Sequence, residues 1–211
     1  MSQCAECRVF ACRLGKIDGA PDDCPMRSEA DVYEWAKNEY VQPETGSVAY
    51  KCAVTESKGF SQWTRLEEIV HFCRRVGFQH LGLAFCVGLR KEAAEVSKIL
   101  KSAGFELDSV ACKTGGIPKE YLGVKEDQKV HPGNYEAMCN PLCQAKILER
   151  AGTEFNILLG LCVGHDTLFI KYTNTPMTVL AVKDRALGHN PLAVLYGNYY
   201  FAQRMAALKK K

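Results

Sequence analysis

The chain has 211 residues, enough to bury a core of its own, and a mild formal net charge of +3 from 27 basic and 24 acidic residues. Because no segment carries a basic stripe, we expect no nucleic acid partner. No apolar stretch is long enough to span a bilayer and no export signal is visible, so we expect a cytoplasmic protein without a membrane partner. In that compartment eleven cysteines, an odd number, favour metal or redox chemistry over a disulfide framework.

Residues 1–27 form a predicted cap that is rich in turns and cysteine. Its cysteines follow the pattern C-x2-C-x4-C-x11-C and are Cys4, Cys7, Cys12 and Cys24. Four thiolates on one irregular loop can surround a single metal centre, and both zinc and iron–sulfur clusters accept such a set. Only one C-x2-C knuckle is present and Pro25 follows the last cysteine, which favours a [4Fe–4S] cluster over zinc. The alternative is four unrelated cysteines in a disordered tail.

A helical lead-in is predicted from residue 28 to residue 77, before the sheet begins. Its three helices are expected over residues 29–41, 45–57 and 65–77. Ser28 is predicted to cap the first helix and Thr64 the third, and Gly77 is predicted to end the third. Cys52 and Cys73 are expected on inward helix faces, so we interpret them as packing residues rather than ligands.

From residue 78 onward, short apolar runs alternate with helical patterns. Strands are predicted over residues 80–86, 105–112, 155–162 and 175–183, and helices over residues 89–104, 140–152 and 164–173. Two strand–helix–strand units, 78–112 and 140–183, and a closing helix, 190–208, would complete a domain spanning 28–211. This order predicts an α/β fold, Rossmann-like, with a mainly parallel sheet and helices on both faces.

The two units share a Cys-Val-Gly turn between strand and helix, which begins at Cys86 in the first unit and at Cys162 in the second. Self-similarity this short leaves internal duplication and chance equally open.

Several cysteines are predicted at one edge of the sheet. Cys86, Cys112 and Cys162 each end a predicted strand, and parallel strands all end at the same edge. Cys139 and Cys143 lie at the start of the helix that leads to the strand ending at Cys162. We expect Cys139, Cys143 and Cys162 to hold a second metal centre or cluster, with Cys86 or Cys112 completing it. The alternative is that these cysteines are small buried hydrophobic residues.

Polar residues follow the same edge. His165, at a helix start after Cys162, is the histidine best placed to act as a ligand, proton donor or substrate contact. Lys183 and Arg185 follow the last strand and could bind an anion, although a salt-bridged turn is the commoner outcome. The connection 113–138 is long enough to suggest a functional loop. No phosphate-binding loop or nucleophile elbow is present.

The motifs CAEC, FCVG, LCVG, CNPLC and VKDRALGHNPLAVLY together resemble a family of uncharacterised cysteine-rich prokaryotic proteins. That family is a domain of unknown function that is labelled metal-binding, and the resemblance covers nearly the whole chain. It implies metal binding at the four cysteines of the cap, and it strengthens the case for Cys139, Cys143 and Cys162. It names no reaction and does not decide between an iron–sulfur cluster and zinc.

Three functions therefore stay open. The chain could be an iron–sulfur protein with one or two [4Fe–4S] clusters that passes electrons to a redox partner or acts on a small ligand at the sheet edge. It could be an enzyme whose cluster keeps an open coordination position beneath the loop 113–138. It could instead be an interaction module with structural zinc and thiol sensors, without catalysis.

Overall fold

The computed structural model describes residues 3–197 and 199–208 of the chain. The chain divides into two compact units, Met1–Ser61 and Gln62–Lys211. The predicted cap lies in the first unit and the sheet lies in the second. Among the described residues, no helix combines the length and the apolar character that crossing a membrane requires.

The first unit consists of short 3-10 turns followed by α-helices. The turns cover Cys4–Glu6, Ala11–Leu14 and Ile17–Gly19, and the helices are α1 (Pro25–Ser28), α2 (Ala30–Tyr40) and α3 (Pro43–Gly59). Ser28 does not cap α2 as predicted, because it is the last residue of α1 and its hydroxyl donates to the Glu29 carboxylate at 3.0 Å. Cys52, predicted on the inward face of α3, is exposed, whereas Thr55 is buried. The inward face of α3 is therefore set by Thr55 and not by Cys52.

Helix α4 (Arg65–Val76) opens the second unit and matches its sequence signals. The Thr64 hydroxyl accepts from the Glu67 N–H, and the Glu67 carboxylate accepts from the Thr64 N–H, so two of the free N–H donors at the helix start are satisfied. Gly77 ends the helix at φ 98°, a left-handed conformation that glycine adopts without steric cost. The predicted cap and stop of this helix are confirmed.

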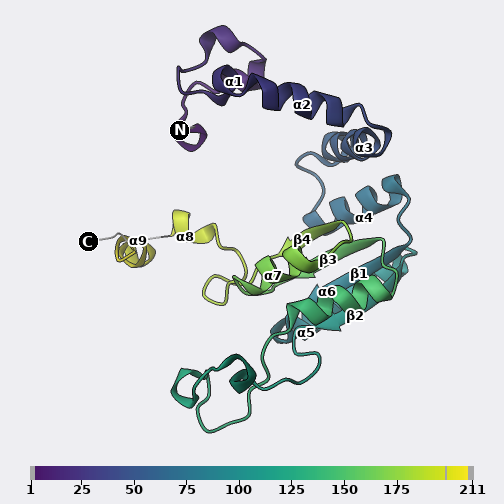
Figure 1. Cartoon of the computed structure of the whole chain (residues 1–211), viewed down its shortest axis with the longest axis vertical. Coiled ribbons are helices and arrows are strands. Elements are labelled where there is room, and N and C mark those ends of the chain that lie inside the picture. The colour runs from purple at the N-terminus through teal and green to yellow at the C-terminus, as the bar shows by residue number, and fades with distance from the viewer. Residues whose placement is uncertain (1–2, 198, 209–211) are drawn as a thin grey trace. The chain divides into compact units, whose positions relative to one another are not determined.

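The second unit contains a four-stranded sheet in which every pair of neighbouring strands is parallel (Figure 1). The strands are β1 (His80–Phe85), β2 (Glu106–Ala111), β3 (Phe155–Leu159) and β4 (Met177–Ala181), in the order β2-β1-β3-β4. The predicted α/β fold with a parallel sheet is confirmed.

Helices cover both faces of this sheet, as predicted. Together with α4, the helices are α5 (Arg90–Ser102), α6 (Pro141–Arg150) and α7 (His165–Tyr172). Leu81 and Ile157 pack with α4 and α5, whereas Ala84 and Leu158, on the same two strands, pack with α6 and α7. Alternate residues of a strand point to opposite faces, so these unbroken apolar runs supply two cores, one on each side of the sheet.

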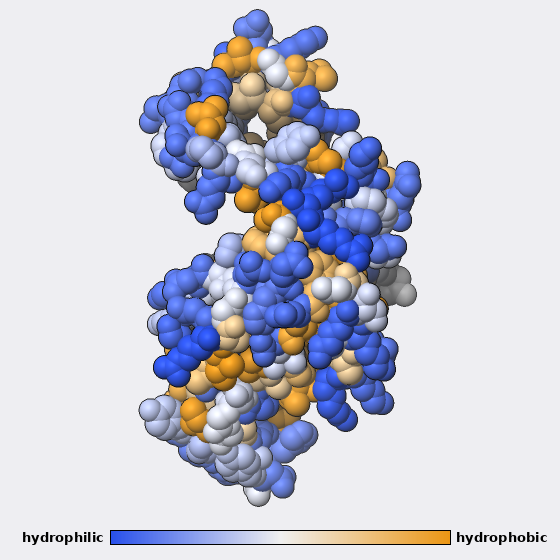
Figure 2. Space-filling view, turned by 90° about the vertical axis from the view of Figure 1, so that its right-hand side faces the viewer, coloured by the Kyte–Doolittle hydropathy of each residue, from blue (hydrophilic) through white to orange (hydrophobic). Residues whose placement is uncertain are grey.

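The closing helix and the connection after β2 are more divided than the sequence predicts. The predicted closing helix 190–208 is divided into α8 (Ala193–Tyr196) and α9 (Tyr199–Ala206), because Gly197 between them is extended at ψ 157°. The connection after β2 contains 3-10 turns at Lys119–Leu122 and Glu126–Gln128 and an antiparallel bridge between Pro118 and Ala137. Hydrophilic side chains cover most of the face shown in Figure 2, with smaller apolar groups between them.

Candidate functional site

The strand order creates a recognisable ligand position beside β1. The chain runs from β1 out to β2 and then returns to the other side of β1 as β3. In doubly wound sheets, ligands bind beyond the carboxyl ends of the strands at the point where the order reverses. Here that point lies between the ends of β1 and β3, where Cys86 follows β1 directly and Cys162 lies three residues beyond β3.

Cys112 contacts two other cysteines at this edge, Cys86 and Cys139. Cys86 and Cys112 are 6% and 1% exposed, and the Cys112 sulfur lies 3.9 Å from the Cys139 sulfur. Cys112 also accepts a hydrogen bond from the Val87 N–H at 3.3 Å, within the turn that leads into α5. In many α/β proteins such N–H groups bind a phosphate, and here one of them points at sulfur.

Asn140 holds Cys139 beside Cys112. Its N–H donates to the Cys112 carbonyl at 2.7 Å, which fixes the chain just before α6 against the end of β2. Its side-chain oxygen accepts from the Cys143 N–H at 3.2 Å and so caps α6, and Pro141 supplies the first helical residue. Asparagine at the N-cap followed by proline is a common helix start, so this role could have been recognised in the sequence.

The three sulfurs differ in their affinity for protons. Hydrogen bonding from Cys112 lowers the pKa of Cys86 to about 5, and the Gly88 N–H and the Lys183 ammonium act in the same direction. Cys112 and then His165 lower the pKa of Cys139 to about 3. The pKa of Cys112 itself is raised, because its proton is shared with Cys139 and Cys86. These directions favour the proton on Cys112 and thiolates at Cys86 and Cys139. The thiolate is the form that binds metals and attacks electrophiles.

His165, at the start of α7, belongs to the same cluster. Its hydrogen bond with Cys139 raises the pKa of the imidazole. Its Nδ1 atom is buried and has no hydrogen-bond partner among the residues that the structure describes. Because an unsatisfied buried polar atom is costly, this nitrogen is suited to meet a ligand, a metal ion or a water molecule.

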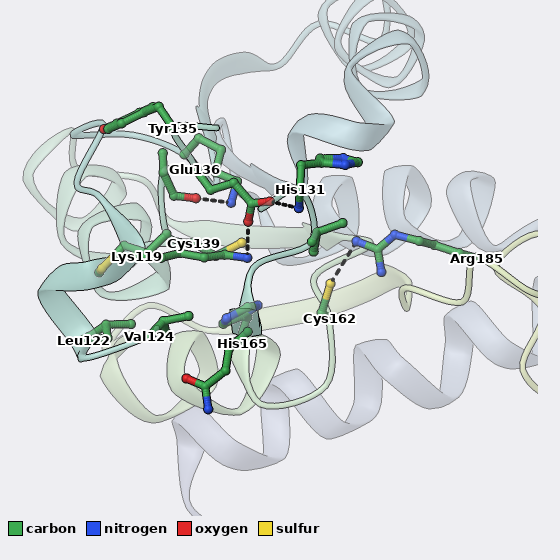
Figure 3. A pocket seen from close by; sticks show the side chains of 15 residues that line it. Lys119, Leu122, Val124, His131, Tyr135, Glu136, Cys139, Cys162, His165 and Arg185 are labelled. Atoms are coloured by element: carbon green, nitrogen blue, oxygen red, sulfur yellow. Dashed lines mark hydrogen bonds and ion pairs between the residues drawn. The ribbon is translucent and has the colours of Figure 1, made fainter. Parts of the chain in front are cut away.

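Cys162 has a cationic partner of its own. The Arg185 guanidinium, in the loop after β4, donates to the Cys162 sulfur at 3.5 Å (Figure 3). This contact raises the pKa of Arg185 and matches a positive charge to the sulfur.

These groups border a cavity of about 710 Å³ between the sheet edge and the loop 113–138 (Figure 3). Cys139, Cys162, His165 and Arg185 lie on the sheet side. The loop contributes Lys113, Lys119, Leu122, Val124, Gln128, Val130, His131, Tyr135, Glu136, Ala137 and Met138. Sulfur, imidazole and guanidinium groups therefore line one cavity.

Residues 24–180 match the family described as "Protein of unknown function (DUF1847)". This match covers more than half of the chain.

The chain belongs to the DUF1847 family.

A relative from Methanocaldococcus jannaschii, named only as an uncharacterized protein, is 41% identical over 198 residues, which are 94% of this chain and 95% of the relative. No solved structure matches the chain.

The family match includes every cysteine predicted at the sheet edge, and the structure separates them into two groups. Cys86, Cys112, Cys139 and Cys162 lie at the cluster or on the cavity wall, with His165. Cys143 is exposed within α6 and is not part of the cavity wall. Cys73, by contrast, is fully buried, and burial raises its pKa to about 12, as suits a packing residue.

The family match also begins at Cys24, the last cysteine of the predicted cap quartet. Cys4 lies in the first 3-10 turn, Cys7 follows that turn, Cys12 lies in the second turn and Cys24 precedes α1. The Cys7 sulfur accepts from the Phe10 N–H at 3.4 Å, a contact that iron–sulfur and zinc ligands commonly receive. Arg27 ties this loop together by donating to the Asp18 and Ala20 carbonyls.

In the observed side-chain conformations of residues 3–197 and 199–208, no three potential metal ligands (histidine, cysteine, aspartate or glutamate) surround a common position. The interactions at the sheet edge instead form a chain, from Cys86 to Cys112 to Cys139 to His165. Binding one ion to all four would require side-chain rotation.

Sequence reasoning missed two further parts of the site. Gln144 is fully buried in α6, and its amide donates to the Phe85 and Val110 carbonyls at 3.2 and 2.7 Å. It thereby ties together the ends of β1 and β2, next to Cys86 and Cys112. Lys113 and Lys119 add positive charge to the cavity wall. The positions of these two lysines depend on the conformation of the loop 113–138, which no local sequence pattern predicts.

Proposed function

We propose that this protein is a metal-binding redox protein with two centres. One is a [4Fe–4S] cluster held by Cys4, Cys7, Cys12 and Cys24, and the other is a metal centre held by thiolates at the sheet edge. The observation that carries the proposal is the contact between Cys112 and Cys139 at the carboxyl edge of the sheet, where Cys112 follows the end of β2. The second centre is the one on which the described cavity opens.

The sulfur separation favours a shared metal ion at the sheet edge. A disulfide would need the two sulfurs at about 2.05 Å, far closer than the 3.9 Å between Cys112 and Cys139. Two thiolates at about 2.3 Å from one tetrahedral ion lie about 3.8 Å apart. Cys86 and His165 flank this pair and are the nearest further ligands, after rotation of their side chains. An ion at this place would be a single zinc or iron ion, or one metal of a cluster.

Metal binding would displace the proton of Cys112. The contacts with Cys139 and Cys86 raise the pKa of Cys112 and so favour its thiol form, whereas a metal ligand must be the thiolate. Binding would then neutralise the repulsion among the three sulfurs. Lys183, beside Cys86, and Arg185, at Cys162, would balance the excess negative charge of a thiolate-ligated centre.

A second function is supported by the same pair of sulfurs. Without metal, a Cys139 thiolate next to the Cys112 thiol has the composition of a redox-sensing dithiol. The protein would then be a thiol-sensing interaction module with structural zinc in the cap. Only this second function requires a reversible disulfide at the sheet edge.

Analysis of iron, zinc and acid-labile sulfide in anaerobically purified protein tests the proposal. We expect iron and sulfide together with broad absorption near ~400 nm, and a metal content above that of the cap cluster alone. Colourless protein with zinc only, and a disulfide detected by mass spectrometry after air oxidation, would support the sensing module instead. Protein without iron, zinc or sulfide would refute both.

The cap quartet gives a prediction of its own. Cys7→Ser is expected to remove one centre while the sheet unit stays folded, because Cys7 lies in the first compact unit and the sheet lies in the second. Iron and sulfide content should fall to that of the sheet-edge centre, and the thermal unfolding of the second unit should be unchanged. Cys52→Ser, an exposed cysteine in the same unit, is the matched control. Loss of the whole fold in Cys7→Ser would contradict the division into two centres.

A further inference from the structure

The cavity beside the sheet edge has the size and shape of a binding site for a small molecule. Its volume of about 710 Å³ lies within the range of about 300–1,000 Å³ that is typical of such sites. It lies at the carboxyl edge of a parallel sheet, where doubly wound proteins bind ligands. The proposed metal centre borders it but does not fill it, because the loop supplies most of its wall.

The loop wall is preformed. The Lys129 side chain is only 4% exposed and bridges the carboxylates of Glu120 and Glu126 at 2.5 and 2.7 Å. The antiparallel bridge between Pro118 and Ala137 closes the base of the loop. A wall already fixed in place loses little conformational entropy when a ligand binds, which favours specific recognition.

Positive charge exceeds carboxylate charge on this wall. Lys113, Lys119 and Arg185 line the cavity, and Glu136 is the one carboxylate among its described lining residues. Glu136 is already occupied, since it forms an ion pair with Lys119 and accepts from the His131 N–H (Figure 3). These contacts hold the pKa of Glu136 at about 2.

Two cations keep free donors at the sheet end of the cavity. Lys113 follows Cys112 and gives one hydrogen bond, to the Ala137 carbonyl, out of three that an ammonium group can give. Arg185 gives one, to Cys162, out of five. The unsatisfied Nδ1 of His165 lies on the same side.

The loop side of the cavity carries a group of apolar residues beside its charged and polar ones. Leu122, Val124, Val130 and Met138 line it, together with Tyr135. Leu122 and Val130 are 63% and 71% exposed, so large apolar surfaces meet water next to the cavity. Covering them with an apolar ligand would be favourable.

We propose that this cavity binds a small organic carboxylate, with its anionic group among Lys113, Arg185 and His165 and its apolar body against Leu122, Val124 and Val130. A phosphate is disfavoured, because an N–H group that would cradle it after β1 is donated to Cys112 and no glycine-rich phosphate loop is present. Binding itself is independent of metal. Only the role of this ligand as the substrate of the neighbouring centre rests on the proposed function.

A matched pair of probes tests the charge requirement. 3-Phenylpropionate and the isosteric, uncharged 3-phenylpropanamide are titrated calorimetrically into the full chain, both as purified and after metal removal. We expect the acid to bind at least about tenfold more tightly than the amide, because hydrogen bonds to charged groups are the stronger ones. Equal affinities, or no binding of the acid at millimolar concentration, would overturn the proposal. Tighter binding of phenyl phosphate than of the acid would overturn the assignment to carboxylates.

Variants locate the binding. Lys113→Gln and Arg185→Gln should each weaken binding of the acid about tenfold and leave the amide unchanged, whereas Leu122→Ser should weaken both. Lys98→Gln, on the exposed surface of α5 in a pair with Glu95, is the matched control. Unchanged affinity for the acid in both cavity variants would refute the site. Metal content, measured on the protein as purified, keeps the two proposals separate. If the purified protein contains no iron or zinc and still binds the acid, the proposed function is refuted and this inference stands.

Discussion

Cys139→Ser is expected to abolish metal binding at the sheet edge while the cap centre stays filled. Cys139 contacts both Cys112 and His165, so its loss divides the set of potential ligands into two. Serine is a much poorer ligand than a thiolate. Replacing a residue that only hydrogen-bonds to a metal ligand typically lowers metal affinity by roughly 10- to 100-fold. Replacing Cys139, a ligand itself, should lower the metal affinity of the sheet edge by more than that. The readout is metal per chain by mass spectrometry, after dialysis against a chelator that spares the cap cluster.

The matched control for this variant is Cys143→Ser. Cys143 lies four residues farther along, is exposed, and is absent from the cavity wall. The sequence pattern makes the two cysteines equivalent, whereas the structure makes only Cys139 a neighbour of Cys112. We expect unchanged metal content in Cys143→Ser. Equal loss in both variants would restore the predicted ligand set of Cys139, Cys143 and Cys162, and no loss in either would remove the sheet-edge centre from the proposal.

The sheet could be predicted from the sequence because each buried parallel strand leaves a short, unbroken apolar run in it. Runs such as residues 80–86 and 155–162 are apolar without alternation, which indicates strands buried on both faces. Since all parallel strands end at one edge, the sequence alone places Cys86 and Cys112 at the same edge of the sheet. The α4 boundaries followed in the same way from Thr64 and Gly77.

The distinction between Cys139 and Cys143 could not be predicted, because it depends on where α6 begins. Helical spacing would put residues four apart on one face. However, α6 starts at Pro141, so Cys139 lies outside the helix, in a segment held by the bond from Asn140 to the Cys112 carbonyl. That bond joins residues 28 positions apart, and no local pattern reports it. The roles of Gln144, Lys113 and Lys119 could not be predicted for the same reason, since they also depend on contacts between residues far apart in the sequence.

The topology also bears on the repeated Cys-Val-Gly turn. The units β1–α5–β2 and β3–α7–β4 extend in opposite directions from the centre of the sheet, with α5 and α7 on opposite faces. A half-turn about an axis parallel to the strands, between β1 and β3, relates the two units. Cys86 directly follows β1 and Cys162 lies three residues beyond β3, so the two turns match in sequence and not in strand register. Each cysteine lies next to a cation, Lys183 for Cys86 and Arg185 for Cys162. Such an arrangement is compatible with internal duplication and brings the two turns to the same edge.

The metal-free protein should reveal the Cys139 thiolate through its reactivity. An ordinary thiol, with a pKa near about 8.5, loses its thiolate as the pH falls, so its alkylation should slow roughly 10³-fold between about pH 8 and about pH 5. The pKa of Cys139 is lowered to about 3, so Cys139 stays ionised over this whole range. We therefore expect its rate of alkylation by iodoacetamide to be nearly independent of pH there.

Low nucleophilicity accompanies a low pKa and limits the absolute rate. With a Brønsted coefficient of about 0.4–0.5, Cys139 should react only about tenfold faster than N-acetylcysteine at about pH 5, and more slowly at about pH 8. The pH–rate profiles of Cys139 and N-acetylcysteine should therefore cross, and this crossing indicates a thiolate at Cys139. Peptide mapping by mass spectrometry assigns the modified residue. His165→Gln should raise the pKa of Cys139, since it removes the hydrogen bond and the charge of His165, which lower that pKa, and should restore a slope to the profile. A Cys139 rate that falls in parallel with N-acetylcysteine would show that Cys139 is not held as a thiolate, and the proposed metal centre would lose the ligand that joins Cys112 to His165.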